Sequence, residues 1–155
     1  MKQINDQASY SAAIVHVVRQ AEKLADKIVG RQLPIDTLAI FAQSSVEYEY
    51  VDNYLRQIGT ISKLSHGATL YVEPKNKMLV NNHVIKHLGA RQPDSVRPER
   101  GYVDFPVDNY AELKIMLAKD TRVKEVTSGT GMKLLELKDP SFDVRGYIVE
   151  SSDDR

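Results

Sequence analysis

His87, Tyr102 and Asp104 are the residues of this chain whose types best suit proton transfer. Histidine titrates near neutral pH, and a neighbouring carboxylate can fix which of its ring nitrogens carries the proton. Together with Thr37 these residues fall on predicted strands, so that all four could line one cavity. The alternative, which we favour from the sequence, is that they are partly buried sheet residues that satisfy one another's hydrogen bonds.

Three arginines, Arg91, Arg97 and Arg100, lie in the segment ARQPDSVRPERG. A guanidinium can bind a carboxylate or a phosphate through two parallel hydrogen bonds, so these arginines could hold an anionic ligand at the mouth of a cavity. Asp94 and Glu99 are interspersed among them. A solvated loop whose charges pair with one another is therefore the alternative interpretation.

Two further patterns do not support the chemistry that they suggest. His83 and His87 stand on one predicted strand, where a spacing of four residues separates them by about 13 Å, so they cannot share one metal ion. The segment TSGTG at residues 127–131 contains glycines. It lacks the lysine and the strand-to-helix context of a phosphate-binding loop, and we predict a hairpin turn there.

Composition limits the class of protein. A chain of 155 residues is long enough for one domain with its own core. Equal numbers of basic and acidic residues, 21 of each, give no overall field that would attract nucleic acid, and no strand pair interleaves basic with aromatic positions. The absence of cysteine excludes disulfides, thiolate metal sites and a cysteine nucleophile. With neither a signal-peptide core nor a bilayer-spanning apolar run, we expect a cytoplasmic protein without membrane contact.

The elements that must position these residues follow a repeated order. Apolar residues at helical spacing between 14 and 28 predict an N-terminal helix that packs on its own domain, with a dimer seam as the alternative. The next segment, 33–100, reads as strand, helix and three strands, at 35–41, 44–59, 61–64, 68–73 and 78–88. The last segment, 101–155, repeats that order at 102–107, 110–117, 123–126, 132–137 and 144–150.

This order predicts an α+β fold. Residues 1–32 supply a helix that packs on a single domain at 33–155, and this domain consists of two βαβββ modules at 33–100 and 101–155. Ser44 and Glu47 have the spacing of a capping box, in which the hydroxyl accepts from the third helical amide and the carboxylate reaches back to the cap amide. Asp108 is the predicted N-cap of the second module's helix.

Three segments resemble parts of a known family. IDTLAIF is similar to the first module strand of the vicinal oxygen chelate superfamily, which includes glyoxalases, extradiol dioxygenases and bleomycin-resistance proteins. GYVDFPV resembles the equivalent strand of the second module, and KLLELKDPSFDVRGYIVE resembles the closing hairpin. The N-terminal helix and the long loop before the second module look closest to the YecM-type branch. The resemblance covers about residues 10–150 and implies that the paired modules form a curved mixed sheet.

The resemblance also implies a metal site in the concave sheet. Its ligands would be a histidine on each module's first strand and an acid near each module's last strand. In this sequence the corresponding positions hold Thr37, Tyr102, His87 and Gly146, with Glu150 as the closest carboxylate. A catalytic divalent ion needs three or more suitable donors, so we expect no metal and no cofactor. Glu150 and His87 are the residues that could still bind one.

We therefore predict a metal-free module that binds a small molecule or forms an interaction surface, including that of a homodimer, through a degenerate site. The predicted ligand-binding residues are Thr37, His87, Arg91, Arg100, Tyr102 and Asp104. The alternative is a metal-independent lyase or isomerase acting on a small anionic substrate. In it His87 would be the general base, with Tyr102 and Asp104 as further candidate catalytic residues and an arginine as the anchor. Fold analogy alone does not decide between the two.

Overall fold

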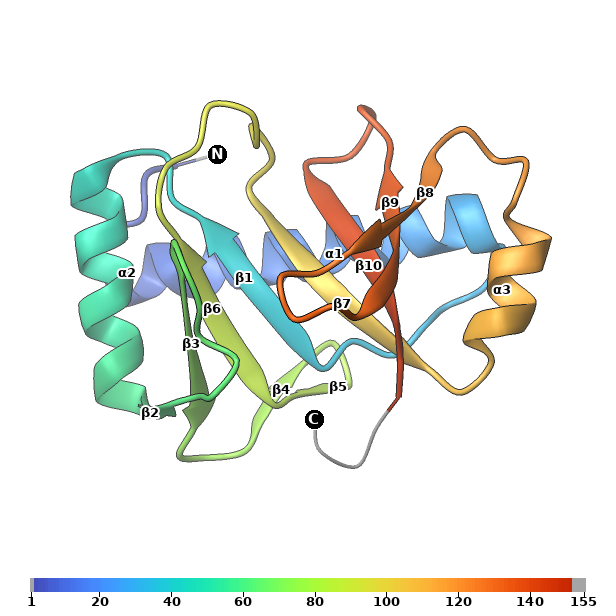
Figure 1. Cartoon of the computed structure of the whole chain (residues 1–155). Helices are drawn as coiled ribbons and strands as arrows, with labels where there is room; N and C mark the ends of the chain where they lie inside the picture. Colours follow the sequence, from blue (N-terminus) through green and yellow to red (C-terminus); the bar gives the residue numbers. More distant parts are fainter. Residues whose placement is uncertain (1, 152–155) are drawn as a thin grey trace.

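The computed structural model describes residues 2–151, which form three helices and ten strands (Figure 1). The predicted α+β class, with an N-terminal helix and a large curved mixed sheet, is confirmed. Met1 and residues 152–155 of the predicted domain lie outside the described residues, and the division into two modules stays a prediction. The elements in chain order are α1 (Gln7–Val29), β1 (Thr37–Phe41), α2 (Ser45–Ile58), β2 (Gly59–Ile61), β3 (Thr69–Pro74), β4 (Met78–Val80), β5 (His83–Ile85), β6 (His87–Arg91), β7 (Gly101–Val107), α3 (Tyr110–Met116), β8 (Val123–Thr127), β9 (Lys133–Lys138) and β10 (Val144–Glu150).

The main sheet has the strand order β2-β3-β6-β1-β7-β10-β9-β8. Its centre is the antiparallel pair β1 and β7, in which Thr37 lies opposite Asp104. Each of these two strands has a parallel neighbour on its outer side, β6 beside β1 and β10 beside β7. The sheet is therefore built from two similar halves, and the first strands of the two halves meet at its middle.

Helix α1 lies behind the sheet and spans both halves (Figure 1). Asp6 caps its first turn by accepting from the amide of Ser9 at 2.8 Å, and Gly30 ends it with a φ of 83°, a left-handed conformation that glycine adopts without strain. The helix buries its apolar stripe against its own sheet, which removes each large side chain from water at a gain of about 1.5–3 kcal/mol. The buried residues are Tyr10, Ala13, Ile14, Val17, Val18, Ala21, Leu24, Ala25 and Ile28.

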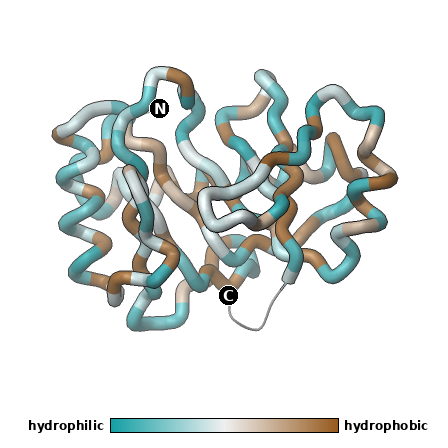
Figure 2. The backbone as a smooth tube through the Cα atoms, viewed as in Figure 1, coloured by the Kyte–Doolittle hydropathy of each residue, from teal (hydrophilic) through white to brown (hydrophobic). Residues whose placement is uncertain are grey.

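The two faces of the sheet differ in character. A Cβ built on Gly101 would stand 3.1 Å from Val17 of α1, so the alternate residues Val103 and Phe105 of β7 face the helix. Tyr102 and Asp104 consequently project from the opposite face, as the strand periodicity predicts. Figure 2 shows that the turns of α2 carry both hydrophobic and hydrophilic residues. None of the helices within residues 2–151 combines the length and apolar character needed to cross a membrane.

The prediction of one strand at residues 78–88 is wrong. Asn81 and Asn82 have positive φ angles of 48° and 70°, so the chain turns back as a hairpin between β4 and β5, which form a separate two-stranded sheet. Asparagine is one of the few residues that adopts this conformation readily. His83 lies on β5 and contacts Glu22 of α1 at 2.9 Å. His87 lies on β6 in the main sheet, so the two histidines do not share one strand.

The two predicted helix caps are only partly realised. Ser44 does accept from the amide of Glu47 at 3.1 Å, which closes the first turn of α2. The Glu47 carboxylate, however, accepts from the amide of Gln43 at 2.9 Å instead of the cap amide. In the second half Asn109, not Asp108, is the N-cap of α3, and it makes no side-chain capping bond.

Candidate functional site

A cavity of about 480 Å³ lies on the face of the sheet opposite α1. Both halves line it, and so does the turn between β8 and β9, which passes in front of β1 and β7 in Figure 1. Residues 128–131 of that turn are small, and the turn appears in pale colours in Figure 2. The lining residues are Thr37, Phe41, Lys63, Leu64, Ser65, His66, Thr69, Tyr71, Arg91, Arg97, Tyr102, Asp104, Val126, Thr127, Ser128, Gly129, Thr130, Met132, Leu134, Glu136, Tyr147 and Val149.

Strand pairing arranges the polar residues of this face in rows. Thr37 on β1 pairs with His87 on one side and with Asp104 on the other. Asp104 in turn pairs with Tyr147 of β10, so that the row continues into the second half. Phe41 pairs with Arg91 in another row, about 13 Å away along the strands at ~3.3 Å per residue. The pairing register therefore brings together residues that are far apart in the sequence.

Four of the six predicted ligand-binding residues line the cavity: Thr37, Arg91, Tyr102 and Asp104. His87 lies beside Thr37, but only 4% of its surface is exposed and it is not among the lining residues. Its Nδ1 stands 3.4 Å from the hydroxyl oxygen of Ser62. The imidazole is thus placed behind the cavity surface.

The structure places Arg100 outside the cavity. Its guanidinium donates to both carboxylate oxygens of Glu47, at 2.6 and 2.8 Å, and to the carbonyl of Phe41 at 2.9 Å. Both charged side chains are buried, with 3% and 1% of their surfaces exposed. Burial acts to raise the pKa of Glu47, but the hydrogen bonds from Arg100 and from the Ile4 and Gln43 amides outweigh it and leave the pKa below its usual value. Arg100 therefore joins the β6–β7 connection to α2.

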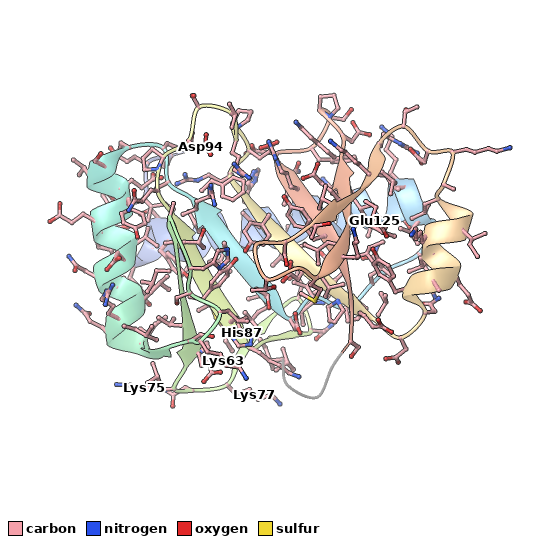
Figure 3. All side chains as sticks on the ribbon, viewed as in Figure 1. Lys63, Lys75, Lys77, His87, Asp94 and Glu125 are labelled. Atoms are coloured by element: carbon pink, nitrogen blue, oxygen red, sulfur yellow. The ribbon has the colours of Figure 1, made fainter. Side chains whose placement is uncertain are left out.

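Arg91 and Arg97 lie at one edge of the cavity and share one carboxylate. Arg97 donates to Asp94 at 2.8 Å, and Arg91 stands 3.5 Å from the same oxygen while donating to the hydroxyl of Thr69 at 3.2 Å. The amide of Val96, supported by Arg97, holds the pKa of Asp94 below its usual range. The predicted self-pairing of this loop is thus realised in part, but one carboxylate faces two guanidiniums. Figure 3 shows Asp94 and His87 near opposite ends of β6.

The second half contributes a partly buried tyrosine and a carboxylate. The Tyr147 hydroxyl donates to Glu136 at 3.0 Å, and burial, with Glu136 nearby, raises the pKa of Tyr147 to about 12. Arg145 donates to Glu99 at 2.8 Å and lies 3.9 Å from Glu136. Sequence reasoning missed Glu136 and Tyr147, although alternation along β9 and β10 places both on the cavity face.

Aromatic rings connect the two sides of the cavity. The ring centroids of Phe41 and Tyr102 are 5.6 Å apart, and those of Tyr102 and Tyr147 are 5.4 Å apart in an edge-to-face arrangement. Tyr71 of β3 also lines the cavity, and Gly89 of the neighbouring strand β6 leaves room for its ring: a Cβ at Gly89 would stand only 2.8 Å from it. The cavity therefore offers aromatic surface beside its charged lining residues.

The donors at the positions implied by the resemblance do not fit a metal ion. Gly146 faces α1, since a Cβ there would meet Phe105 and Leu24. The residue paired with Tyr102 on β10 is Arg145, a cation. Glu150 is the last residue of β10 and does not line the cavity. Throughout the described part of the chain, no group of three or more histidine, aspartate or glutamate side chains is placed to hold a metal.

Comparisons with known proteins show likeness at the level of the fold. No protein-family model matches this chain, and no curated protein matches it. The solved structure named "Structural Genomics, Protein EC4020" is 12% identical, covers 97% of this chain and 94% of its own, and has a TM-score of 0.65. A glyoxalase/bleomycin resistance protein/dioxygenase superfamily member from Vibrio splendidus 12B01 is 6% identical, covers 76% of this chain and 99% of its own, and has a TM-score of 0.45. EC4020 and this chain have the same fold.

Proposed function

We propose that this chain is a metal-free small-molecule-binding module of the vicinal oxygen chelate superfamily, closest in layout to the YecM-type branch, and that its cavity holds a small organic anion. The observation that carries the proposal is the pair Arg91 and Arg97, which share the single carboxylate of Asp94 at the cavity edge. An incoming carboxylate or phosphate would supply the second anion. The sequence resemblance and the paired halves of the sheet support the assignment to the superfamily.

The size and lining of the cavity support a small ligand with an apolar body. A volume of about 480 Å³ lies within the range of ordinary small-molecule sites. Phe41, Tyr71 and Tyr102 give flat apolar surface, while the guanidiniums give direction. The proposed ligand is therefore a carboxylate or phosphate attached to a ring.

Isothermal titration calorimetry with 4-methylbenzoate and phenyl phosphate tests this proposal. The R91Q and R97Q variants should each weaken binding by about tenfold, because each removes one charge-assisted contact worth roughly 1.5–3 kcal/mol before solvent screening. R31Q is the matched control, since Arg31 is exposed and lies outside the cavity lining. Equal affinity in the wild type and both cavity variants would contradict the assignment of these arginines.

Native mass spectrometry of protein purified without added metal or chelator tests the metal-free part of the proposal. We expect no stoichiometric ion after titration with nickel, manganese or zinc, because Thr37, Tyr102 and Arg145 are poor or repulsive donors. Retention of one ion per chain would contradict this. Any small molecule that copurifies would identify the ligand class directly.

The second candidate function is a metal-independent lyase or isomerase. The row formed by His87, Thr37 and Asp104 supports it. Such an enzyme would use His87 as general base, and the buried position of this residue requires the substrate to reach deep beside Thr37. Proton NMR in D₂O tests this candidate by measuring hydrogen exchange in a small carboxylic acid. An enzyme would exchange the hydrogen next to the carboxylate for deuterium, and H87Q would abolish the exchange. Binding without exchange would favour the binding module.

A further inference from the structure

Four residues of the cavity lining form one row across neighbouring segments of the first half. His66 pairs with Thr69 through two backbone hydrogen bonds of 3.1 and 3.0 Å. Thr69 of β3 pairs with Arg91 of β6, and Arg91 pairs with Phe41 of β1. All four line the cavity. Because residues that pair directly stand side by side, the row brings an imidazole and a guanidinium to the two sides of one hydroxyl.

The loop that carries His66 is held against β3. The Ser62 amide donates to the Tyr71 carbonyl at 2.8 Å, and the Tyr71 amide donates to the Ser65 hydroxyl at 2.9 Å. The ring of His66 stacks on that of Tyr71, with centroids 6.3 Å apart. Lys63, labelled in Figure 3, marks the same loop. Backbone bonds and a ring contact therefore fix the position of His66 in the row.

One hydrogen bond determines which nitrogen of His66 a ligand meets. The Nδ1 atom lies 2.7 Å from the carbonyl oxygen of Leu64. A carbonyl oxygen only accepts, so Nδ1 carries a hydrogen and Nε2 is the nitrogen left for a ligand. Nε2 accepts in the neutral ring and donates in the protonated ring. An anion therefore contacts it favourably when one proton lies between the two.

The rest of the row supplies donors and positive charge. Arg91 donates to the Thr69 hydroxyl at 3.2 Å, so the hydroxyl keeps its own hydrogen to donate to a ligand. Arg91 and Arg97 share the single carboxylate of Asp94, which leaves one net positive charge. The exposed Lys63 adds to that charge. The row thus suits an anion with several oxygens and two negative charges.

We infer that the ligand is a phosphate monoester and that Nε2 of His66 shares one proton with a phosphate oxygen. This inference rests on the proposed function and specifies the acidic group of its ligand. A phosphate monoester offers three oxygens, which suit the two guanidiniums and the Thr69 hydroxyl. Phosphate monoesters and histidine side chains ordinarily titrate close together, at about pH 6 and about pH 6.5, so their complex can keep one proton near neutral pH. A carboxylate or a sulfate ester loses its proton in much stronger acid and brings none.

Isothermal titration calorimetry at about pH 7.5 tests the inference with three probes. They are phenyl phosphate, phenyl sulfate, which has the same shape and one charge fewer, and inorganic phosphate, which lacks the ring. We expect phenyl phosphate to bind about tenfold more tightly than either of the others. Titrations in two buffers of different ionisation enthalpy give the proton uptake. This should be roughly half a proton or more for phenyl phosphate, because both free groups are largely deprotonated at that pH.

A variant of His66 assigns the proton. H66N keeps a side-chain N–H for the Leu64 carbonyl and removes Nε2. It should abolish the proton uptake, weaken phenyl phosphate about fivefold and leave phenyl sulfate within about twofold. H16Q is the matched control, since His16 of α1 lies outside the cavity lining. The other ionisable residues that face the cavity with His66 are of types that ordinarily titrate outside the range of about pH 6–8, and they include Lys63, Tyr71, Arg91, Arg97, Asp104 and Glu136.

The possible outcomes separate the inference from the proposed function. Selective binding of phenyl phosphate, with a proton uptake that H66N abolishes and H16Q keeps, supports the inference. If phenyl sulfate or inorganic phosphate binds as tightly as phenyl phosphate, or if H66N leaves the proton uptake unchanged, the inference is overturned, while weaker binding in R91Q would still support the anion-binding function. If phenyl phosphate, phenyl sulfate and 4-methylbenzoate all fail to bind, the proposed function fails together with the inference.

Discussion

Removing the charge of Glu47 should destabilise the protein more than any other single carboxylate-to-amide change described here. Glu47 and Arg100 are both almost fully buried and joined by two hydrogen bonds, so E47Q leaves a guanidinium without its counter-charge. Breaking one partner of a buried pair costs about 3–5 kcal/mol. For a domain of this size each kcal/mol lowers the Tm by about 2–4 °C, so the expected decrease is roughly 6–20 °C.

Urea denaturation followed by circular dichroism measures this cost, with E49Q on the exposed side of the same helix as control. R100M should cost a similar amount because it leaves the buried carboxylate without its counter-charge. The loss of unfolding free energy in the double variant E47Q/R100M should be smaller than the sum of the two single losses by about 2 kcal/mol or more, because the double variant removes both charges. A loss below about 1 kcal/mol in E47Q, or strict additivity, would refute the reasoning.

The same pair contributes a defined pH dependence. The pKa of Glu47 is lowered in the folded protein from its usual 4.5, so its contribution to stability is complete above that value and is lost as the pH falls through the folded pKa. E47Q should therefore flatten the acid limb of a plot of unfolding free energy against pH. An acid limb identical to that of the wild type would contradict the assignment.

Three further changes test other parts of the structure. S44A should cost about 1 kcal/mol in urea denaturation, because it removes the acceptor that closes the first turn of α2; a loss near zero would contradict the cap. G89A should cost about 1–3 kcal/mol and alter probe affinity, since the new Cβ displaces the ring of Tyr71; unchanged stability and binding would contradict this packing. The pKa of Tyr147 is raised from 10 to about 12, so its contribution to stability is complete below pH 10 and is lost as the pH rises toward 12; Y147F should show a smaller loss over that interval.

Periodicity predicted the secondary structure well wherever strong turns bound an element. The last strand was predicted at 144–150 and is found at Val144–Glu150, because the preceding DPSFD turn fixes its start. The 78–88 segment was misjudged because Asn81 and Asn82 adopt the left-handed conformation without any glycine to mark the turn. The Asn-Asn pair that follows the apolar run 78–80 was the available indication of a hairpin.

The candidate site was predictable in its facing pattern and not in its long-range partners. Alternation placed Tyr102 and Asp104 on one face of β7, and the structure has them there. Nothing local to Arg100 could indicate that a carboxylate 53 residues earlier would engage it. Glu136 was missed for a similar reason, since its proximity to Tyr147 depends on the β9–β10 register. The pairing of distant segments, rather than propensity, decides which charged residues reach the cavity.

The central β1–β7 ladder has a consequence for the folding kinetics. β1 must find both β6 and β7, strands that lie far along the chain, whereas β8, β9 and β10 join consecutive neighbours through short connections. Closing long loops costs entropy before distant contacts can compensate for it, and such topologies fold in roughly milliseconds to seconds. We therefore expect the β8–β9–β10 meander to form early in the transition state. We expect the cavity, which both halves line, to be completed in the last step of folding.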